Sequence, residues 1–147
     1  MTNITELANE LREIVAWQRT PEELSESDYE KMIIFGIKTL YIDTGRANAY
    51  SNDMIIIEET EDPPTTVTNV LFSETLPIDE EKYVLLVAQI VFFKKVQSDV
   101  NNIVSYTTDA LSVANADKPY AHLQDTISNL ENERRIVFYK MTNYSFL

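Results

Sequence analysis

The sequence predicts a mainly α-helical protein, in which a helical bundle surrounds a central apolar helix and a β-hairpin or extended arm interrupts the helices. Residues 83–93 (YVLLVAQIVFF) contain one polar residue, Gln89. As a helix this stretch would be apolar on every side and would need to be covered on every side. Apolar residues recur at helical spacing before and after it. Between residues 46 and 77 β-branched residues replace that spacing.

One domain is expected, because 147 residues is an ordinary length for a single hydrophobic core. We see no internal repeat and no linker that would divide the chain. The predicted organisation is a helical-bundle domain over residues 1–147, with a β-rich excursion at about residues 46–77 and a C-terminal tail at about residues 142–147.

A first amphipathic helix is predicted near the N-terminus. Asn3 and Glu6 have the spacing of a capping box. The apolar residues that follow recur at helical spacing and predict a helix that ends near Trp17 and Gln18. Residues 20–23 (TPEE) place an N-cap, an N1 proline and a capping acid in the order of a new helix start.

A second long helix is expected after residues 27–30 (SDYE), which repeat the start signal, and it should end at residues 43–45 (DTG). Gly36 in its middle costs about 1 kcal/mol relative to alanine, so another helix is expected to approach closely there. The apolar face should comprise Tyr29, Met32, Ile33, Ile37, Leu40 and Tyr41, broadened by Ile34, Phe35 and Ile42.

The excursion reads as a long β-hairpin or extended arm. Residues 54–57 (MIII) and 67–72 (VTNVLF) are β-branched and aromatic runs, and the segment between them is acidic and contains two prolines. We therefore expect an acidic, proline-stiffened tip. Two strands alone are marginal in water, so the arm needs a partner surface, either on the bundle or on another subunit. The candidate contact residues are Ile55, Ile57, Val67 and Phe72.

The central helix is expected from about Asp79 to about Asn101, and residues 103–118 are expected to be irregular. Residues 117–119 (DKP) open a last helix, whose apolar spacing continues to Met141 through Leu123, Ile127, Leu130 and Val137 or Phe138. The chain beyond it is aromatic and apolar, which is unusual for a terminus left in water. Tyr144, Phe146 and Leu147 are therefore candidate partner-binding residues. Aromatic residues elsewhere at element ends serve either interfaces or the ends of the bundle.

Charge and composition exclude several classes of function. Residues 1–81 hold five Lys and Arg against eighteen Asp and Glu, whereas residues 82–147 hold seven against six. Nucleic-acid binding needs a concentrated basic face, so it is not expected. The acidic first part of the chain, residues 1–81, is either a solvated surface or a surface that meets a basic partner.

The absence of cysteine excludes disulfides and thiolate sites. We expect no signal peptide and no membrane span.

No motif in the sequence points to catalysis or to a cofactor. His122 is the only histidine, so no His–His metal pair exists, and it is expected at or near the surface. The acidic residues 58–62 lack the ligand spacing of a calcium loop, and two glycines cannot build a phosphate-binding loop. Asp125, Glu131 and Glu133 are expected to be solvated and to pair with Arg134 or Arg135. We predict no enzyme activity, no cofactor, and no catalytic, cofactor-binding or metal-binding residues.

Residues 106–120 (YTTDALSVANADKPY) and 132–141 (NERRIVFYKM) resemble the C-terminal part of phage virion proteins, and the whole layout resembles the small head–tail connector (adaptor) proteins of tailed bacteriophages. The resemblance implies a virion protein, made in the host cytoplasm. It implies a homo-oligomeric ring of about twelve identical subunits between portal and tail. The C-terminal segment would then contact the portal protein, and the excursion would touch neighbours or tail and tail-completion proteins.

Two alternatives remain open from the sequence. The chain could be a tail-completion protein of the same assembly. It could instead be a free acidic protein that mimics DNA and occupies a basic partner, although mimicry needs carboxylates at phosphate-like intervals and the first helices offer only a loose version.

Overall fold

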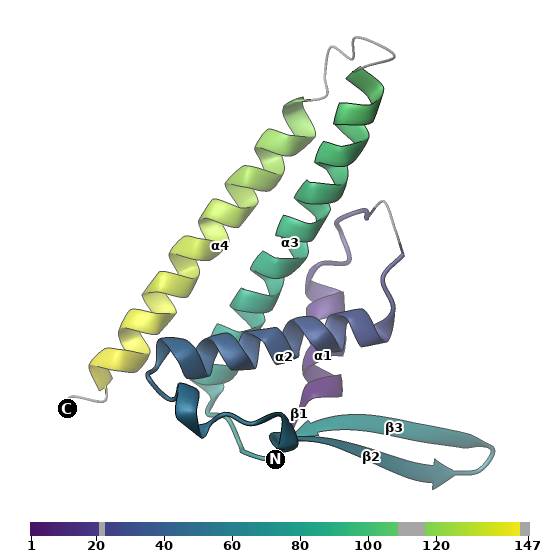
Figure 1. The fold of residues 1–147 in the computed structure, drawn as a ribbon, viewed down its shortest axis with the longest axis vertical. Helices are drawn as coiled ribbons and strands as arrows, with labels where there is room; N and C mark the ends of the chain where they lie inside the picture. The colour runs from purple at the N-terminus through teal and green to yellow at the C-terminus, as the bar shows by residue number, and fades with distance from the viewer. Residues whose placement is uncertain (21–22, 109–116, 145–147) are drawn as a thin grey trace.

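The computed structural model describes residues 1–20, 23–108 and 117–144, and in this part of the chain four helices accompany a small three-stranded antiparallel sheet (Figure 1). The fold is mainly helical, as the sequence predicts. The helices are α1 (Ile4–Ile14), α2 (Glu26–Asp43), α3 (Ile78–Thr108) and α4 (Asp117–Tyr144), with the short 3₁₀ turns η1 (Ala47–Ala49) and η2 (Asn52–Met54). The strands are β1 (Thr2–Asn3), β2 (Ile55–Asp62) and β3 (Thr65–Phe72).

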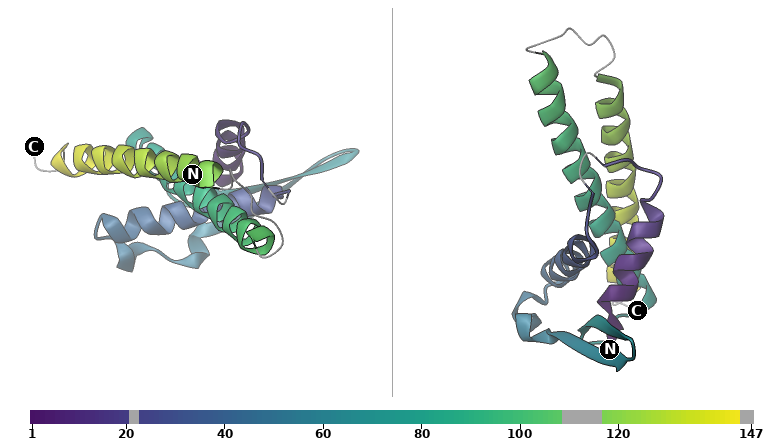
Figure 2. Two further views of the ribbon diagram at one scale, coloured as in Figure 1. Left: turned by 90° about the horizontal axis from the view of Figure 1, so that it is seen from above. Right: turned by 90° about the vertical axis from the view of Figure 1, so that its right-hand side faces the viewer.

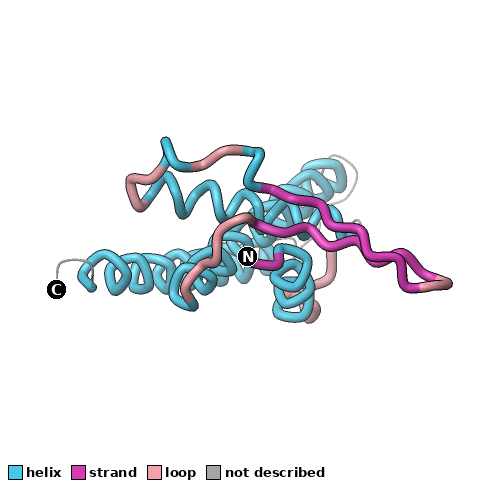
Figure 3. The backbone as a smooth tube through the Cα atoms, turned by 90° about the horizontal axis from the view of Figure 1, so that it is seen from below, coloured by secondary structure: helices cyan, strands magenta, loops and turns pink. Residues whose placement is uncertain are grey.

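The longest elements, α3 and α4, lie side by side and run in opposite directions, and α2 crosses α3 near its N-terminal end (Figures 1 and 2). Helix α1 packs on α2 and on β3. The hairpin formed by β2 and β3 projects from the base of the helices, on the side away from the C-terminal end of α4 (Figure 3).

Helix α1 begins as predicted, because the Asn3 side chain accepts a hydrogen bond from the Glu6 amide at 3.1 Å. It ends at Ile14, however, earlier than the predicted Trp17. The chain turns at residues 15–17, and the Trp17 ring packs on Phe93 with 5.5 Å between centroids. This tertiary contact competes with continuation of the helix.

Helix α2 begins at Glu26 with a capping box in which Ser25 and Asp28 exchange hydrogen bonds. The expected N-cap, Ser27, is therefore two residues late, because Ser25 caps the helix. These hydrogen bonds from Ser25 to the carboxylate lower the pKa of Asp28. The helix start predicted at residues 20–23 is not seen at Glu23, which precedes α2 without helical structure, and residues 21–22 lie outside the described residues.

The close approach predicted at Gly36 is present. A Cβ atom added to Gly36 would lie 2.7 Å from the Val84 carbonyl oxygen and 3.0 Å from Val84 Cγ1, so α2 crosses α3 at this residue. The helix ends at Asp43 and is followed by Gly45, whose φ of +74° suits glycine. Phe35 and Ile42 do not broaden the apolar face. They are seven residues apart on the opposite side of α2 and are exposed.

The predicted hairpin is present, and its register runs from Ile55 opposite Phe72 to Asp62 opposite Thr65. The acidic residues expected at its tip belong to β2 instead, and only Pro63 and Pro64 form the turn. Strand β1 was not predicted, since two residues carry no strand signal. It pairs with the end of β3 and gives the sheet order β1-β3-β2.

Helix α3 extends to Thr108, beyond the predicted end at Asn101, so residues 103–108 are helical rather than irregular. Residues 109–116 lie outside the described residues. No side chain between Tyr83 and Phe93 is exposed, and Tyr83, Val84 and Phe92 are almost completely buried. The apolar run is therefore covered along its length by the rest of the chain.

Helix α4 begins at Asp117 as predicted, and its apolar stripe forms the expected contacts. Leu123, Ile127 and Val137 are buried, while Leu130, Phe138 and Met141 pack against the core. The helix continues to Tyr144. The predicted tail is therefore helical at residues 142–144, and its remaining residues 145–147 lie outside the described part of the chain.

Candidate functional site

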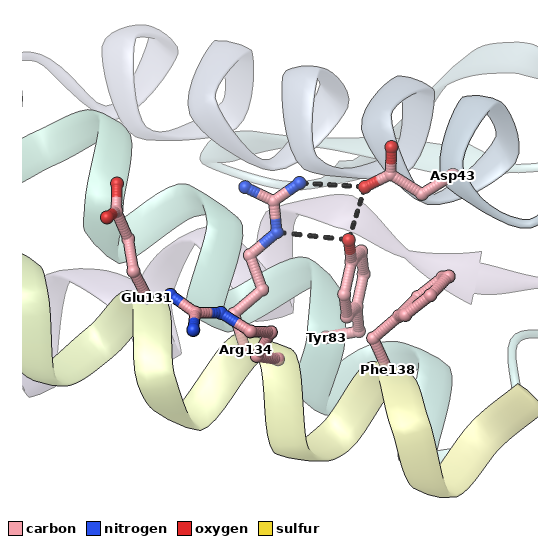
Figure 4. A pocket seen from close by; sticks show the side chains of 6 residues that line it. Asp43, Tyr83, Glu131, Arg134 and Phe138 are labelled. Carbon is pink, nitrogen blue, oxygen red and sulfur yellow. Dashed lines mark hydrogen bonds and ion pairs between the residues drawn. The ribbon is translucent and has the colours of Figure 1, made fainter.

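A charged network lies where α2, α3 and α4 meet (Figure 4). From α4, Arg134 donates through Nη2 to Asp43 Oδ2 at 2.7 Å and through Nε to the Tyr83 hydroxyl at 3.0 Å. The Tyr83 hydroxyl in turn donates to the same Asp43 oxygen. The guanidinium also lies 5.4 Å from the centre of the Tyr83 ring. Three side chains from three helices therefore hold one another in place.

The surroundings of the network fix its protonation. Burial, together with the hydrogen bond to Asp43, raises the pKa of Tyr83 to about 12, although the nearby guanidinium opposes this shift. Burial acts to lower the pKa of Arg134, but its hydrogen bonds to Tyr83 and Asp43 outweigh burial and raise the pKa. At neutral pH the tyrosine is a neutral donor and the arginine is a cation.

The network borders a cavity of about 370 Å³ that is also lined by Glu131, Arg135 and Phe138. The strongest hydrogen-bond donors that line this cavity belong to Tyr83 and Arg134. Both already donate to Asp43 within the chain. The sequence expectation that Arg134 pairs with an acid of its own helix is wrong. Asp43 takes that position, and Glu131 instead lies 3.4 Å from Lys94 on α3.

Sequence reasoning missed this network, although one signal for it exists. Arg134 follows Leu130 by four residues and precedes Val137 by three, so it occupies a position on the core-facing stripe of α4. A cation at such a position needs an acidic partner from another element. The sequence does not say that Asp43, ninety-one positions away, supplies it.

A second cavity of about 320 Å³ lies at the base of the helices, between the end of α2 and the start of α3. Arg46 lines it, with Nη2 at 2.5 Å from Glu80 Oε1 and its guanidinium 4.6 Å from the centre of the Tyr41 ring. Arg46 Nε also donates to Thr44 Oγ1 at 3.0 Å. These contacts tie the chain after α2 to the first turn of α3.

Within residues 1–20, 23–108 and 117–144, no three His, Asp or Glu side chains gather closely enough to hold a metal ion. His122 is exposed, as expected, and its ring meets the Trp17 ring edge-on at 6.4 Å. None of the helices in the described part of the chain has an apolar stretch long enough to cross a bilayer.

The predicted partner-binding residues of the arm fall into two groups. Ile57 and Val67 are 67% and 46% exposed, so their side chains are open to a partner. Ile55 is half-buried against the core. Phe72 is fully buried, with its ring edge-on to Tyr41 at 5.8 Å. Its expected role as a partner contact is therefore wrong, because β1 and the helices of its own chain cover it.

The side chains of the predicted partner-binding residues at the C-terminus lie outside the described part of the chain. Tyr144 is the last residue of α4, and its side chain lies outside what the structure describes. Phe146 and Leu147 are beyond the described residues.

The outer face of α4 carries a surface that the sequence analysis did not identify. Ile136 and Tyr139 are 56% and 67% exposed, and the exposed cations Arg135 and Lys140 lie beside them on the same side of the helix. We call these four residues the α4 patch. The sequence contains a signal for this surface, because Ile136 and Tyr139 fall outside the core-facing stripe that ends at Met141.

No protein-family model, curated protein or solved structure matches this chain.

Proposed function

We propose that the protein is a structural, non-enzymatic subunit that forms a homo-oligomeric ring and acts as a head–tail connector (adaptor) of a bacteriophage virion, between portal and tail. The observation that carries the proposal is the projecting hairpin. It holds exposed apolar side chains at Ile57 and Val67 on a two-stranded element, and such elements need support from a further surface. A neighbouring subunit is the simplest source of that surface.

In this proposal α3 is the central helix of the subunit. Helices α1, α2 and α4 all contact it, and residues 83–93 are covered along their length. Arg134 on α4 further connects to α2 by a salt bridge with Asp43 and to α3 by a hydrogen bond to Tyr83, and Arg46 after α2 forms a salt bridge with Glu80 on α3. A body held together in this way can present an arm in a constant direction, which repeated subunit contacts require.

The charged network fits a structural role better than a catalytic one. A catalytic tyrosine or arginine must reach a substrate, whereas Tyr83 and Arg134 bond to Asp43 inside the chain. The proposal includes no cofactor, no direct sequence-specific nucleic-acid binding and no membrane. Its partners are further copies of the chain, a portal protein, and tail or tail-completion proteins, and its location is the virion after synthesis in the host cytoplasm.

The test is the state of the purified protein, measured by mass photometry and electron microscopy, alone and mixed with a portal ring and with tails. A connector is expected to form closed rings, of about twelve copies, alone or on the portal. Binding to tails but not to the portal would instead indicate a tail-completion protein. A protein that stays monomeric in every mixture would contradict the proposal and favour the free acidic protein.

A further inference from the structure

We propose that the hairpin arm of one copy lies across the α4 patch of a second copy, with Glu59 and Glu61 against Arg135 and Lys140, and Ile57 against Ile136 and Tyr139. The arm here means residues 57–68, the part of the hairpin beyond its buried base. This proposal rests on the proposed self-assembly and names the two surfaces that make the contact.

All charged side chains of the arm are acidic. Residues 55–72 contain four acidic residues and no basic one. Because side chains alternate along a strand, Ile57, Glu59 and Glu61 share one face of β2. That face lies opposite Val70, Thr68 and Thr66 of β3, none of which is charged. The outer part of this face is therefore one exposed apolar side chain followed by two carboxylates.

The α4 patch has the complementary chemistry. Arg135 and Lys140 form no ion pair with any residue that the structure describes, unlike Arg134, Lys94 and Lys95. The two cations flank Ile136 and Tyr139, so this surface, like the arm, combines apolar and charged groups, and its charges have the opposite sign. Arg135 also lines the cavity beside the network.

The spacing of the charges is compatible with this contact. Residues two apart on a strand are separated by about 6.6 Å, which applies to Glu59 and Glu61. Residues five apart on a helix are separated by about 7.5 Å along its axis and by about 140° around it, which applies to Arg135 and Lys140. The two long side chains therefore leave the helix on either side of Ile136 and Tyr139, and each extends towards the arm to meet an acid.

The position of the two surfaces requires a second copy. The arm and the C-terminal half of α4 lie on opposite sides of the subunit (Figures 1 and 3), so an arm cannot reach the α4 patch of its own chain. Where the contact is not returned within the same pair of copies, it is heterologous, and it forms a closed ring or an open filament when repeated. The geometry thus leads to the kind of assembly that the proposed function needs.

Charge reversal tests the contact. The arm variant combines Glu59→Lys with Glu61→Lys, the patch variant combines Arg135→Glu with Lys140→Glu, and a third protein carries all four changes. We expect the arm and patch variants to associate at least about tenfold more weakly than the native chain, because like charges then face each other. The protein with all four changes should regain assembly, since opposite charges face each other again. Asp125→Lys, on α4 far from the patch, is the control and should assemble normally.

Cross-linking gives a second measurement that does not depend on charge. The chain has no cysteine, so a protein with Ile57→Cys and Tyr139→Cys carries only those two thiols. A short bismaleimide should link it into a ladder of dimers and larger species. The matched control places the second cysteine at Asp125, four turns earlier on α4 and about 21 Å away along the axis, and should give no ladder.

The outcomes separate this proposal from the proposed function. Assembly lost in each single-surface variant and regained in the combined one, together with the cross-linked ladder, supports the contact. Native rings that persist in the arm and patch variants, with no ladder, overturn the contact but leave the ring function in place. A native chain that does not associate at high concentration, together with a double-cysteine protein that forms no ladder, overturns both. Circular dichroism and thermal melts of every variant show whether its fold is intact.

Discussion

Gly36 lies where α2 crosses α3, and its lack of a side chain decides how closely the two helices pack. In an uncrowded helix, Gly36→Ala would stabilise the protein by about 1 kcal/mol through helix propensity. Here the added Cβ would meet the Val84 carbonyl oxygen at 2.7 Å, and overpacking of this kind costs about 1–3 kcal/mol or more. We expect Gly36→Ala to lower the free energy of unfolding, measured by urea titration.

The control for this prediction is Lys31→Ala, an exposed position on the same helix, which should change stability by less than about 0.5 kcal/mol. If Gly36→Ala stabilised the protein, the helices would not approach closely at this residue.

Ionisation of the Tyr83 hydroxyl should lower the free energy of unfolding at high pH. Its pKa is raised from 10.0 to about 12 in the folded protein, because burial and Asp43 favour the neutral hydroxyl. The unfolded state titrates near pH 10, so the stabilisation is complete below about pH 10 and is lost as the pH rises towards 12. A difference of about two units corresponds to on the order of 2 kcal/mol. Urea unfolding at pH 9 and at pH 11.5 measures the loss.

The comparison protein is Tyr83→Phe, which has no hydroxyl to titrate at this position. Burial also raises the pKa of Tyr41 and Tyr50, but these residues are present in both proteins, so the difference between the two isolates Tyr83. An equal loss of stability in both proteins would show that the Asp43–Tyr83–Arg134 network does not hold the tyrosine proton.

The hairpin has a buried base and an exposed outer part. Phe72 at its base is fully buried, whereas Ile57 on the opposite strand is 67% exposed. We expect Phe72→Ala to lower the free energy of unfolding by about 3–5 kcal/mol, and Ile57→Ser to change it by less than about 0.5 kcal/mol. Thermal and urea unfolding of the two variants test this contrast. A large loss in Ile57→Ser would mean that the arm packs on its own chain.

The same contrast predicts a pattern of hydrogen exchange. In the isolated subunit, amides of the arm should exchange faster than amides at the base, where the Val70 amide donates to Thr5 Oγ1 at 2.8 Å and β1 pairs with β3. On assembly the arm amides should become protected. Equal, strong protection in the monomer and in the assembly would show that the arm needs no partner.

At the scale of the whole molecule, core packing is expected to depend on α4 as far as Met141, and docking on the residues that follow it. Among the residues whose side chains the structure describes, Met141 is the last of the apolar stripe that packs against the core. Removing residues 143–147 should therefore change the melting temperature by only a few degrees, while it prevents incorporation into an assembly that contains the portal protein. Sedimentation of the truncated chain with portal rings measures incorporation.

Two results would contradict this expectation. If the truncated chain unfolded, the C-terminal residues would belong to the fold of the subunit. If it still joined the portal normally, the docking surface would lie elsewhere, and the arm and the α4 patch would be the next candidates.

Most of the secondary structure could be predicted from the sequence, because it follows from local patterns. Apolar spacing located α1, α2 and α4, β-branched runs located the hairpin, and Gly36 indicated a helix crossing. The errors are local as well. The start of α2, the end of α1 and the extent of α3 depend on caps and packing that a short window does not contain.

The sequence by itself determined the class of the fold, the single hairpin and the asymmetric charge, since these depend on composition and on residues close together in the chain. Only the tertiary structure decided which polar and apolar residues meet. In the folded chain, Arg134 pairs with Asp43 and the helices cover Phe72. Ile136 and Tyr139 stay exposed. Burial and ion pairing depend on which surfaces face each other in space. A helical or strand repeat shows which residues share a face, but not which surface that face contacts.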